Sequence, residues 1–298
     1  MNSDHSLAHT PVEEELLDQP ACWRQAAKVA SRSPLPKESS RVAFVGCGTS
    51  YHVAQAVASW REASGWGESD AFTPSEMPLR RRYDVVVTVS RSGTTTEVLR
   101  LVEALPAGQE VLAITADAES PVARAARRCV ALPFADEQAV VQTRFATSVL
   151  ALWRAQFGHD VEGLSRAAEG RLTVPLPARL TSYRQFVFLG TGPGVGLAAE
   201  ACLKFQEAAL AWAESYAAME FRHGPISLLD PGSLVWALGE LPTGLAEEIR
   251  DSGATLEMSG ADPMAELVRA QRAAVELAKS KGLDPSRPRR LSRSVVLS

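Results

Sequence analysis

Several features that mark secreted, membrane or nucleic-acid-binding proteins are missing from this sequence of 298 residues. No apolar run reaches the length of about 18 uncharged residues that would indicate a transmembrane helix. Residues 1–5 carry neither a basic segment nor an apolar stretch, so no secretory signal is predicted. The formal net charge of −4 does not favour a nucleic-acid partner. We therefore expect a cytoplasmic protein that binds neither membranes nor nucleic acids.

Cysteine and lysine are both scarce. The four cysteines form no CxxC pair, which argues against a disulfide framework and against a zinc site. Few lysines are present to form an imine with a carbonyl substrate, because most of the 31 basic side chains are arginines. The lysines are Lys28, Lys37, Lys204, Lys279 and Lys281. Neither a metal ion nor an organic cofactor is predicted.

The apolar content of 46% is sufficient for a sizeable core, and the length suggests about two domains. After an N-terminal helical segment, residues 1–34, short apolar runs alternate with amphipathic stretches. This alternation predicts a mainly parallel sheet with helices on both faces. The pattern begins again near residue 182, with one strand fewer. We predict α/β domains over 35–160 and 182–298, joined by a linker over 161–181.

The expected elements are separated by turn residues and prolines. We expect helices over 11–31, 53–60, 97–105, 120–127, 138–157, 197–211, 243–252 and 263–280. We expect strands over 41–46, 84–90, 110–115, 129–132, 185–190, 233–239 and 255–258, and a strand-like apolar tail at 294–297.

The turn Ser90–Thr96 combines five hydroxyl groups with the Arg91 guanidinium, between a predicted strand and a predicted helix. Hydroxyls, turn amides and a helix dipole are typical of a phosphate site. One hydroxyl would suffice for a helix cap, so we favour phosphate binding over capping. The glycine-rich turn Gly46–Ser50 lies at the first βα connection, where such sheets place ligands. Gly190–Gly194 is a weak dinucleotide motif, because Pro193 removes an amide and no acidic residue is clearly placed about 20 residues later.

Glu200, Lys204 and Glu207 are spaced to lie on one face of the predicted helix 197–211. Spacing alone favours an exposed ion triplet that contributes little to stability. The functional alternative is a carboxylate base beside an ammonium group, facing a cleft.

His223 precedes the Gly224-Pro225 pair and lies close to Glu220 and Arg222. The breaker pair turns the backbone where the titratable side chains cluster. A histidine there suits proton transfer, given its ordinary pKa of about 6.5. A solvated loop histidine is an equally good interpretation of these residues alone.

Several motifs, in order, resemble the SIS (sugar isomerase) family, and specifically the isomerase half of glucosamine-6-phosphate synthase. They are Cys47-Gly-Thr-Ser-Tyr-His52, Ser90-Arg-Ser-Gly-Thr-Thr95, Leu203-Lys-Phe-Gln-Glu207, Glu214-Ser-Tyr-Ala-Ala-Met-Glu-Phe-Arg-His-Gly-Pro225 and the tail Arg287–Leu297. The resemblance covers roughly residues 35–298. It implies two αβα SIS domains with flavodoxin-like sheets, and a homodimer whose active site lies between subunits and domains.

The resemblance also implies roles for individual residues. Glu207 would move a proton between C1 and C2 of a sugar 6-phosphate, with Lys204 beside it. His223, in one arrangement from the partner subunit, would assist ring opening. The substrate phosphate would be held by Ser50, Ser90, Arg91, Ser92 and Thr95, and the rest of the substrate by Gly48, Thr49, Gln142 and Arg293.

Three features depart from the family pattern, two of them at single residues. Arg91 stands where glutamine is usual, and Arg293 stands where the family has a lysine that forms an imine with the open sugar. Arginine excludes that covalent role, since its pKa is above about 12. Only residues 1–34 precede the first SIS strand, so we expect no glutaminase domain and no ammonia made from glutamine.

The preferred function is isomerisation of an amino- or N-substituted sugar 6-phosphate coupled to loss of the amine, as in a deaminase or deglycase. Plain isomerisation remains open, as does amination with free or partner-supplied ammonia. A non-catalytic sugar-phosphate sensor is the alternative outside the enzyme class. Such a sensor would need the phosphate turns but no base.

Overall fold

The computed structural model describes residues 10–297. Residues 1–9 of the predicted segment 1–34 lie outside the described residues, as does Ser298. The stretch 1–5, in which no secretory signal is predicted, is therefore outside them too.

The described chain alternates strands and helices from β1 onward. The helices are α1 (Pro11–Leu17), α2 (Gln19–Ala30), α3 (Thr49–Ala63), α4 (Thr96–Ala104), α5 (Pro121–Ala125), α6 (Arg144–Gln156), α7 (Val161–Thr173), α8 (Gly194–Ala209), α9 (Leu245–Asp251) and α10 (Pro263–Ser280). The strands are β1 (Val42–Gly46), β2 (Ser69–Phe72), β3 (Val85–Val89), β4 (Val111–Thr115), β5 (Arg128–Ala131), β6 (Gln185–Gly190), β7 (Ala213–Ala217), β8 (Ser233–Leu238) and β9 (Thr255–Glu257).

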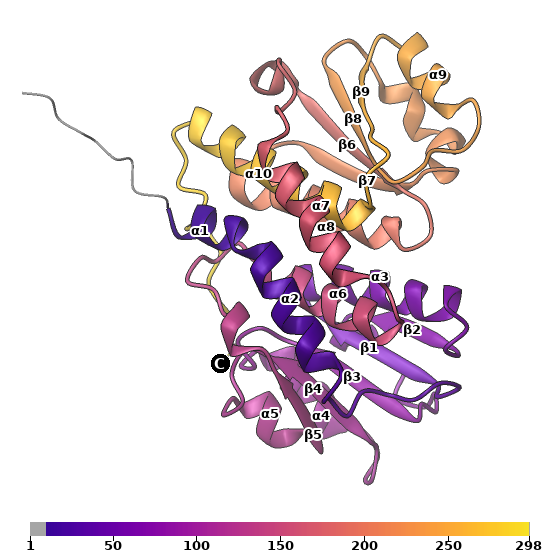
Figure 1. Ribbon diagram of the computed structural model, residues 1–298, viewed down its shortest axis with the longest axis vertical. Coiled ribbons are helices and arrows are strands. Elements are labelled where there is room, and N and C mark those ends of the chain that lie inside the picture. Colours follow the sequence, from indigo (N-terminus) through magenta and orange to yellow (C-terminus); the bar gives the residue numbers. More distant parts are fainter. Residues whose placement is uncertain (1–9, 298) are drawn as a thin grey trace, which may run out of the picture.

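The strands form two parallel sheets, one in each lobe of the molecule (Figure 1). The first has five strands in the order β2-β1-β3-β4-β5, and the second has four in the order β7-β6-β8-β9. The order is the flavodoxin-like one, and the second sheet repeats it without a fifth strand. This confirms the predicted tandem α/β architecture and the shorter second half.

Two strands were absent from the prediction, and they occupy equivalent places. β2 pairs with β1, and β7 pairs with β6, so each forms one edge of its sheet. Neither is a continuous apolar run, because each is only partly buried on its edge. The central strands β1, β3, β4 and β8 are buried along their whole length, and their apolar sequences identified them.

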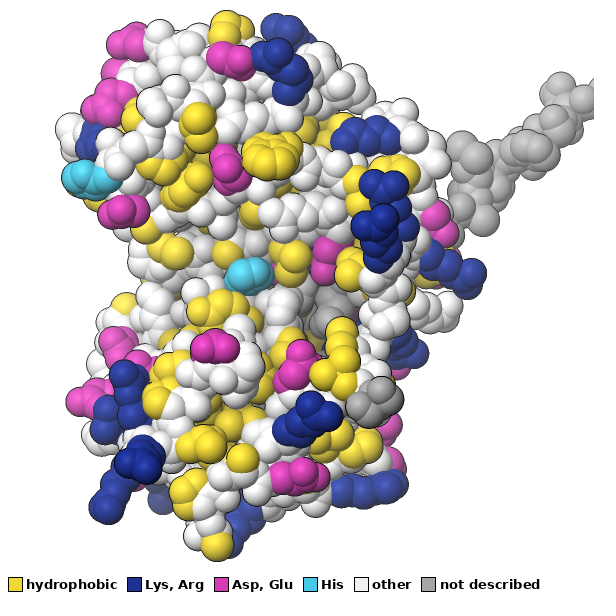
Figure 2. All heavy atoms as spheres, turned by 180° about the vertical axis from the view of Figure 1, so that it is seen from behind, with side chains coloured by type: hydrophobic (Ala, Val, Ile, Leu, Met, Phe, Trp, Pro, Cys, Tyr) yellow, Lys and Arg dark blue, Asp and Glu magenta, His cyan; other side chains and the backbone are white. Residues whose placement is uncertain are grey.

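A layer of helices lies between the two sheets, where α2, α3, α6, α7, α8 and α10 pack on one another (Figure 1). One continuous core joins side chains of both lobes, including Phe44 and Trp153 on one side and Phe188 and Trp236 on the other. From the opposite side the surface draws in at a waist between the lobes (Figure 2). The lobes are therefore joined by packed helices.

The helix predicted over 11–31 is broken at Asp18 into α1 and α2. Pro20 lies in the first turn of α2, where its missing N–H is harmless but would break a continuous helix. The Leu16 carbonyl, which Pro20 cannot bond, accepts a hydrogen bond of 3.2 Å from Gln19 Nε2 instead. After the break, α1 packs against α10 as well as α2.

Three other expectations differ from the structure. Residues 161–181 are not a simple linker, because they contain α7, which packs against α2 and α10. The predicted helix 138–157 begins only at Arg144, because carboxylates hold the backbone before it. The tail 294–297 forms no strand and instead bonds to the turn at Thr96, with Leu297 N donating to Thr96 Oγ1 at 2.9 Å. Among residues 10–297, no helix is long and apolar enough to cross a membrane.

Candidate active site

The three charged residues of α8 form a buried cluster. Lys204 Nζ lies 2.6 Å from Glu207 Oε2, 2.9 Å from Thr49 Oγ1 and 3.5 Å from Glu200 Oε1. The side chains of Lys204 and Glu200 are 2% and 1% exposed, and that of Glu207 is 21% exposed. The interpretation as an exposed ion triplet, which spacing alone favoured, is therefore wrong.

The protonation of this cluster follows from its burial. Burial raises the pKa of Glu200 to about 7, although the Lys204 ammonium opposes the rise. Burial lowers the pKa of Lys204, but the charges of Glu200 and Glu207 outweigh it and raise the pKa above its ordinary value. Lys204 is therefore a buried cation that is held charged by two carboxylates.

Close packing of α8 on α3 brings Lys204 to Thr49. A Cβ on Gly196 would lie 2.6 Å from the His52 carbonyl oxygen and 2.7 Å from Ala56 N. Only glycine lets the α8 backbone approach α3 this closely. The turn before α3 thereby delivers the Thr49 hydroxyl to the α8 ammonium.

Two adjoining cavities bring most of the predicted site residues together. One, of about 170 Å³, is lined by the predicted residues Gly48, Thr49, Thr95, Gln142, Glu207 and Arg293. The other, of about 40 Å³, is lined by Ser50, Ser90, Arg91, Ser92, Thr95, Gln142 and Arg293. Glu207 therefore lines one cavity, and the hydroxyls of the predicted phosphate turn surround the other.

The turn after β3 is held in a tight shape. Gly93 has a φ of +61°, and a Cβ there would lie 2.0 Å from Ser120 Oγ, so no other residue fits. Ser90 Oγ and Thr95 Oγ1 are 3.3 Å apart at its two ends. A small anion can be held between such hydroxyls by donors that carry no fixed charge.

Arg91 is buried and bonded to backbone carbonyls. Its Nη1 donates to the oxygens of Glu137 at 2.9 Å and Ala139 at 3.2 Å, and its Nη2 donates to that of Arg293 at 2.7 Å. Its Nε has no hydrogen-bond partner among the described residues. Arg91 thus links the turn to the tail, and its predicted role as a phosphate ligand remains a prediction.

The C-terminal tail lies across this turn and closes one wall of the larger cavity with Leu291, Ser292, Arg293, Ser294 and Val295. Ser294 Oγ lies 3.1 Å from Ser92 Oγ and 2.9 Å from Thr94 Oγ1. The guanidinium of Arg293 is about half exposed and binds both carboxylate oxygens of Asp136 at 2.6 Å. The tail is tied to the site by side chains as well as by its backbone.

His223 is the predicted catalytic residue that the structure does not bring to Glu207. It ends the short 3₁₀ helix Glu220–His223, is exposed, and lines neither cavity. Gly224 after it has a φ of +144°, as the breaker pair indicated. Within a single chain, the site therefore contains Glu207 and Lys204 but not His223.

The sequence interpretation missed other residues of the site, because nothing in their spacing marks them. Cys47 lines both cavities, and burial raises the pKa of its thiol to about 11, which argues against a thiolate nucleophile. Asp136 and Glu137 lie in the loop before α6, next to Arg293 and Arg91. Val140 of that loop also lines the larger cavity.

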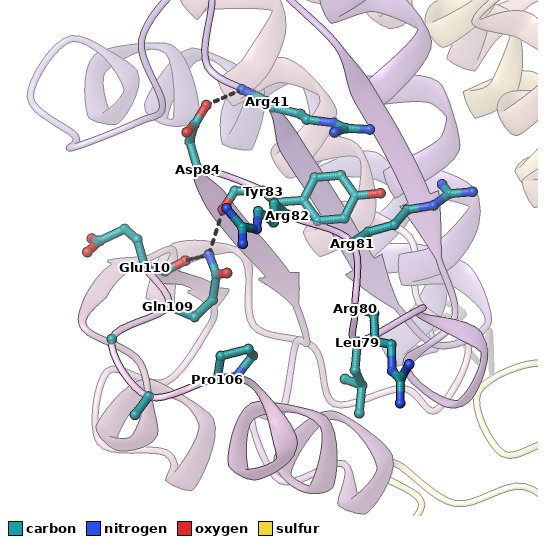
Figure 3. A pocket seen from close by; sticks show the side chains of 12 residues that line it. Arg41, Leu79, Arg80, Arg81, Arg82, Tyr83, Asp84, Pro106, Gln109 and Glu110 are labelled. Atoms are coloured by element: carbon teal, nitrogen blue, oxygen red, sulfur yellow. Dashed lines mark hydrogen bonds between the residues drawn. The ribbon is translucent and has the colours of Figure 1, made fainter.

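A wider concavity of about 980 Å³ lies elsewhere, at the opposite end of β3 (Figure 3). Arg41, Arg80, Arg81 and Arg82 surround it, with Asp84 bonded to the backbone of Arg41 at 2.7 Å. Arg41 and Arg81 are paired with Glu68 and Asp70, respectively. This concavity contains none of the predicted site residues. No group of three or more potential metal ligands occurs in the part of the chain that the structure describes.

Comparison with known proteins assigns the fold. The family model described as the SIS domain matches residues 37–155, which hold β1 to β5 and the phosphate turn. Residues 37–155 therefore form a SIS domain. The second sheet lies outside the matched residues and repeats the strand order of the first.

Two further comparisons cover most of this chain. A glutamine–fructose-6-phosphate aminotransferase [isomerizing] of Sulfurisphaera tokodaii is 26% identical, over 88% of this chain and 51% of that protein. The chain thus spans about half the length of the aminotransferases it matches. The structure of a glucosamine-6-phosphate deaminase of Thermotoga maritima is 26% identical, with a TM-score of 0.79 over 97% of this chain and 100% of that one.

A third comparison shows the fold alone. The structure of a tagatose-6-phosphate ketose/aldose isomerase of Escherichia coli has a TM-score of 0.76 and is 20% identical, over 97% of this chain and 96% of that one. The arrangement of both lobes therefore occurs in proteins that are named for different activities.

Proposed function

We propose that this protein is a phosphosugar isomerase of the SIS family that acts on an amino- or N-substituted sugar 6-phosphate. The observation that carries the proposal is the position of Glu207. This carboxylate lines the larger cavity while it accepts a hydrogen bond from a buried, charged lysine. A general base needs this combination of access to substrate and a fixed orientation.

Each group has a defined task in the proposed reaction. Glu207 takes the proton from C2 of the open-chain aldose and returns it at C1, so that an enol-type intermediate connects the two forms. Lys204 keeps the carboxylate oriented and compensates its charge. The hydroxyls of Ser50, Ser90, Ser92 and Thr95 would hold the phosphate in the smaller cavity, which adjoins the cavity that Glu207 lines.

Amine loss follows from the same proton transfer. Moving the proton of a 2-amino aldose from C2 to C1 turns the C2–N bond into an imine. Water adds to that imine, and ammonia or the substituted amine leaves, which yields a ketose 6-phosphate. In a fructosyl-amino acid 6-phosphate the amine is on C1, so the proton moves from C1 to C2, and hydrolysis of the C1 imine releases the amino acid and yields an aldose 6-phosphate. No imine with a protein lysine is required, in keeping with Arg293 in the tail and with the pairing of Lys204 to two carboxylates. The deaminase of similar structure supports this reaction over plain isomerisation.

The decisive experiment is deuterium incorporation from solvent at C2 of the sugar phosphate. We expect exchange in the wild type and a decrease of about 10²–10⁴ in Glu207→Gln, the usual weight of general-base catalysis, with little change in ligand affinity. Glu103→Gln, an exposed change on α4, is the matched control. Equal exchange in the wild type and Glu207→Gln would remove Glu207 as the base. Exchange in neither the wild type nor Glu207→Gln would favour the alternative of a non-catalytic sugar-phosphate sensor.

The substrate is identified by a panel of 6-phosphates that includes glucosamine, galactosamine and fructosyl-amino acid derivatives. Release of ammonia or of the amino acid, read separately, distinguishes a deaminase from a deglycase. Glucosamine 6-phosphate formed from fructose 6-phosphate and added ammonia would instead favour amination. The match to one half of the aminotransferases supports that second candidate.

A further inference from the structure

The loop between β5 and α6 carries the site residue Gln142, and its approach to the cavity is fixed by a buried carboxylate of the N-terminal helix. Glu15 of α1 is 2% exposed. Its Oε1 accepts hydrogen bonds from the backbone N–H groups of Gln138 and, at 3.3 Å, Ala139. These amides lie 123 and 124 residues from Glu15 in sequence, so the contact joins two distant segments.

The same loop is held from two other directions. Arg91 of the phosphate turn donates to the carbonyl oxygens of Glu137 and Ala139, at 2.9 and 3.2 Å. Ser286, before the tail, accepts from the N–H of Val140 at 2.9 Å through its carbonyl oxygen. The Ser286 hydroxyl in turn accepts from Val12 N of α1 at 3.2 Å. The amides of residues 138–140 are thus bound by Glu15 and Ser286, and the carbonyls of Glu137 and Ala139 are bound by the phosphate turn.

We propose that Glu15 is a positioning residue for the sugar-phosphate site, which holds residues 137–140 so that Gln142 and the Arg91–tail contact stand in place. Glu15 does not line either cavity, so it acts through the loop and not on the substrate. Without its carboxylate, the amides of Gln138 and Ala139 would lose this acceptor, and the loss is expensive for the buried amide of Ala139. The inference rests on the proposed function for its kinetic readout, but the contact with the loop can be tested independently.

The charges around Glu15 are consistent with this task. Three charged groups face Glu15: the Glu137 carboxylate of the loop, the Arg144 guanidinium of α6 and the Arg91 guanidinium of the phosphate turn. One carboxylate oxygen of Glu15 and one of Glu137 have no hydrogen-bond partner among the residues described. Burial, followed by the charge of Glu137, raises the pKa of Glu15 to about 7, while the loop amides oppose the rise. A carboxylate in this position costs folding free energy, which its two loop contacts offset.

The first test is hydrogen–deuterium exchange of the loop amides in the full chain. In Glu15→Ala, we expect residues 137–142 to exchange at least about tenfold faster than in the wild type, since losing one bond worth about 1.4 kcal/mol opens the loop tenfold more often. Glu14→Ala, an exposed change one residue earlier on α1, should leave the loop unchanged. If Glu15→Ala does not fold, Glu15→Gln should retain protection, and the shorter Glu15→Asp should lose it. Equal loop exchange in all these variants would overturn the proposal.

The second test is a double-mutant cycle with Gln142→Ala, read as KM and kcat for glucosamine 6-phosphate. If Glu15 acts through the loop, Glu15→Ala should raise KM about tenfold alone and add little once Gln142 is gone. A general loss of stability would instead give additive effects, and additivity would refute the positioning role. A wild type that is inactive on every sugar 6-phosphate of the panel would refute the proposed function, and the exchange experiment would still decide whether Glu15 holds the loop.

Discussion

The Arg91 guanidinium donates a hydrogen bond of 2.7 Å to the carbonyl oxygen of Arg293. Both residues depart from the motifs that the chain resembles, and they are in direct contact. Arg91 joins the phosphate turn to the tail, and Arg293 continues the link by binding both oxygens of Asp136. The two arginines therefore form one connection that holds the tail against the site.

Arg91 has two roles to be separated, the predicted one of binding the substrate phosphate and the structural one of joining the turn to the tail. We expect Arg91→Ala with Ser92→Ala to weaken binding of fructose 6-phosphate by roughly 2–4 kcal/mol, given charge-assisted bonds of about 1.5–3 kcal/mol and incomplete additivity. Isothermal calorimetry measures the loss, with Arg100→Ala on the exposed face of α4 as control. Arg91→Lys keeps the charge but not the fork of three carbonyl bonds. Unchanged affinity in the double variant would remove the turn from the phosphate site.

The buried cation of α8 should be critical for stability. Among the described residues, Lys204 is the only cation within ion-pair distance of Glu200 and Glu207, so Lys204→Met leaves both carboxyl groups without an opposite charge. We expect a loss of about 3–5 kcal/mol in the free energy of unfolding, measured in urea. Adding Glu200→Gln should restore part of it, whereas Lys28→Met, an exposed change on α2, should cost almost nothing. A loss below about 0.5 kcal/mol would show that the cluster contributes no more to stability than an exposed ion pair does.

The exposed position of His223 makes the predicted homodimer testable by complementation. His223→Asn should change the free energy of unfolding by less than about 0.5 kcal/mol, as expected for an exposed side chain. If His223 completes the partner's site, mixing and reassembling inactive Glu207→Gln and His223→Asn chains should restore roughly a quarter of wild-type activity, because half of the dimers would have one intact site. No recovery, in dimers shown by sedimentation to have exchanged subunits, would place each site within one chain.

The pH dependence of stability should report the buried Glu15. Because burial raises the pKa of Glu15 from 4.5 to about 7, the folded protein keeps a proton that the unfolded chain has already lost. The contribution of Glu15 to the free energy of unfolding therefore falls as the pH rises from about 4.5 to about 7, and does not change beyond that. The free energy of unfolding in urea should differ less between about pH 5 and about pH 8 for Glu15→Gln than for the wild type or Glu14→Gln. An unchanged difference would show that Glu15 does not titrate in this window.

The central strands of the two sheets could be predicted from the sequence, whereas the edge strands β2 and β7 could not. β1, β3 and β8 are covered on both faces, so each needs an apolar run that is visible in the sequence. β2 and β7 are edge strands with polar residues, and they are defined by pairing with β1 and β6. The break at Asp18 had a local signal in Pro20, whose effect on the preceding carbonyl was overlooked.

By itself, the sequence determined the repeated α/β pattern, the hydroxyl-rich turn after β3 and the close spacing of Glu200, Lys204 and Glu207. These features depend on local periodicity and on residue types within a few positions of one another. Only the tertiary structure decided that Lys204 is buried against Thr49, that Arg91 binds the tail and that Glu15 holds the loop before α6. Burial and contacts between segments more than 100 residues apart are set by how helices and sheets pack, and no local pattern encodes them.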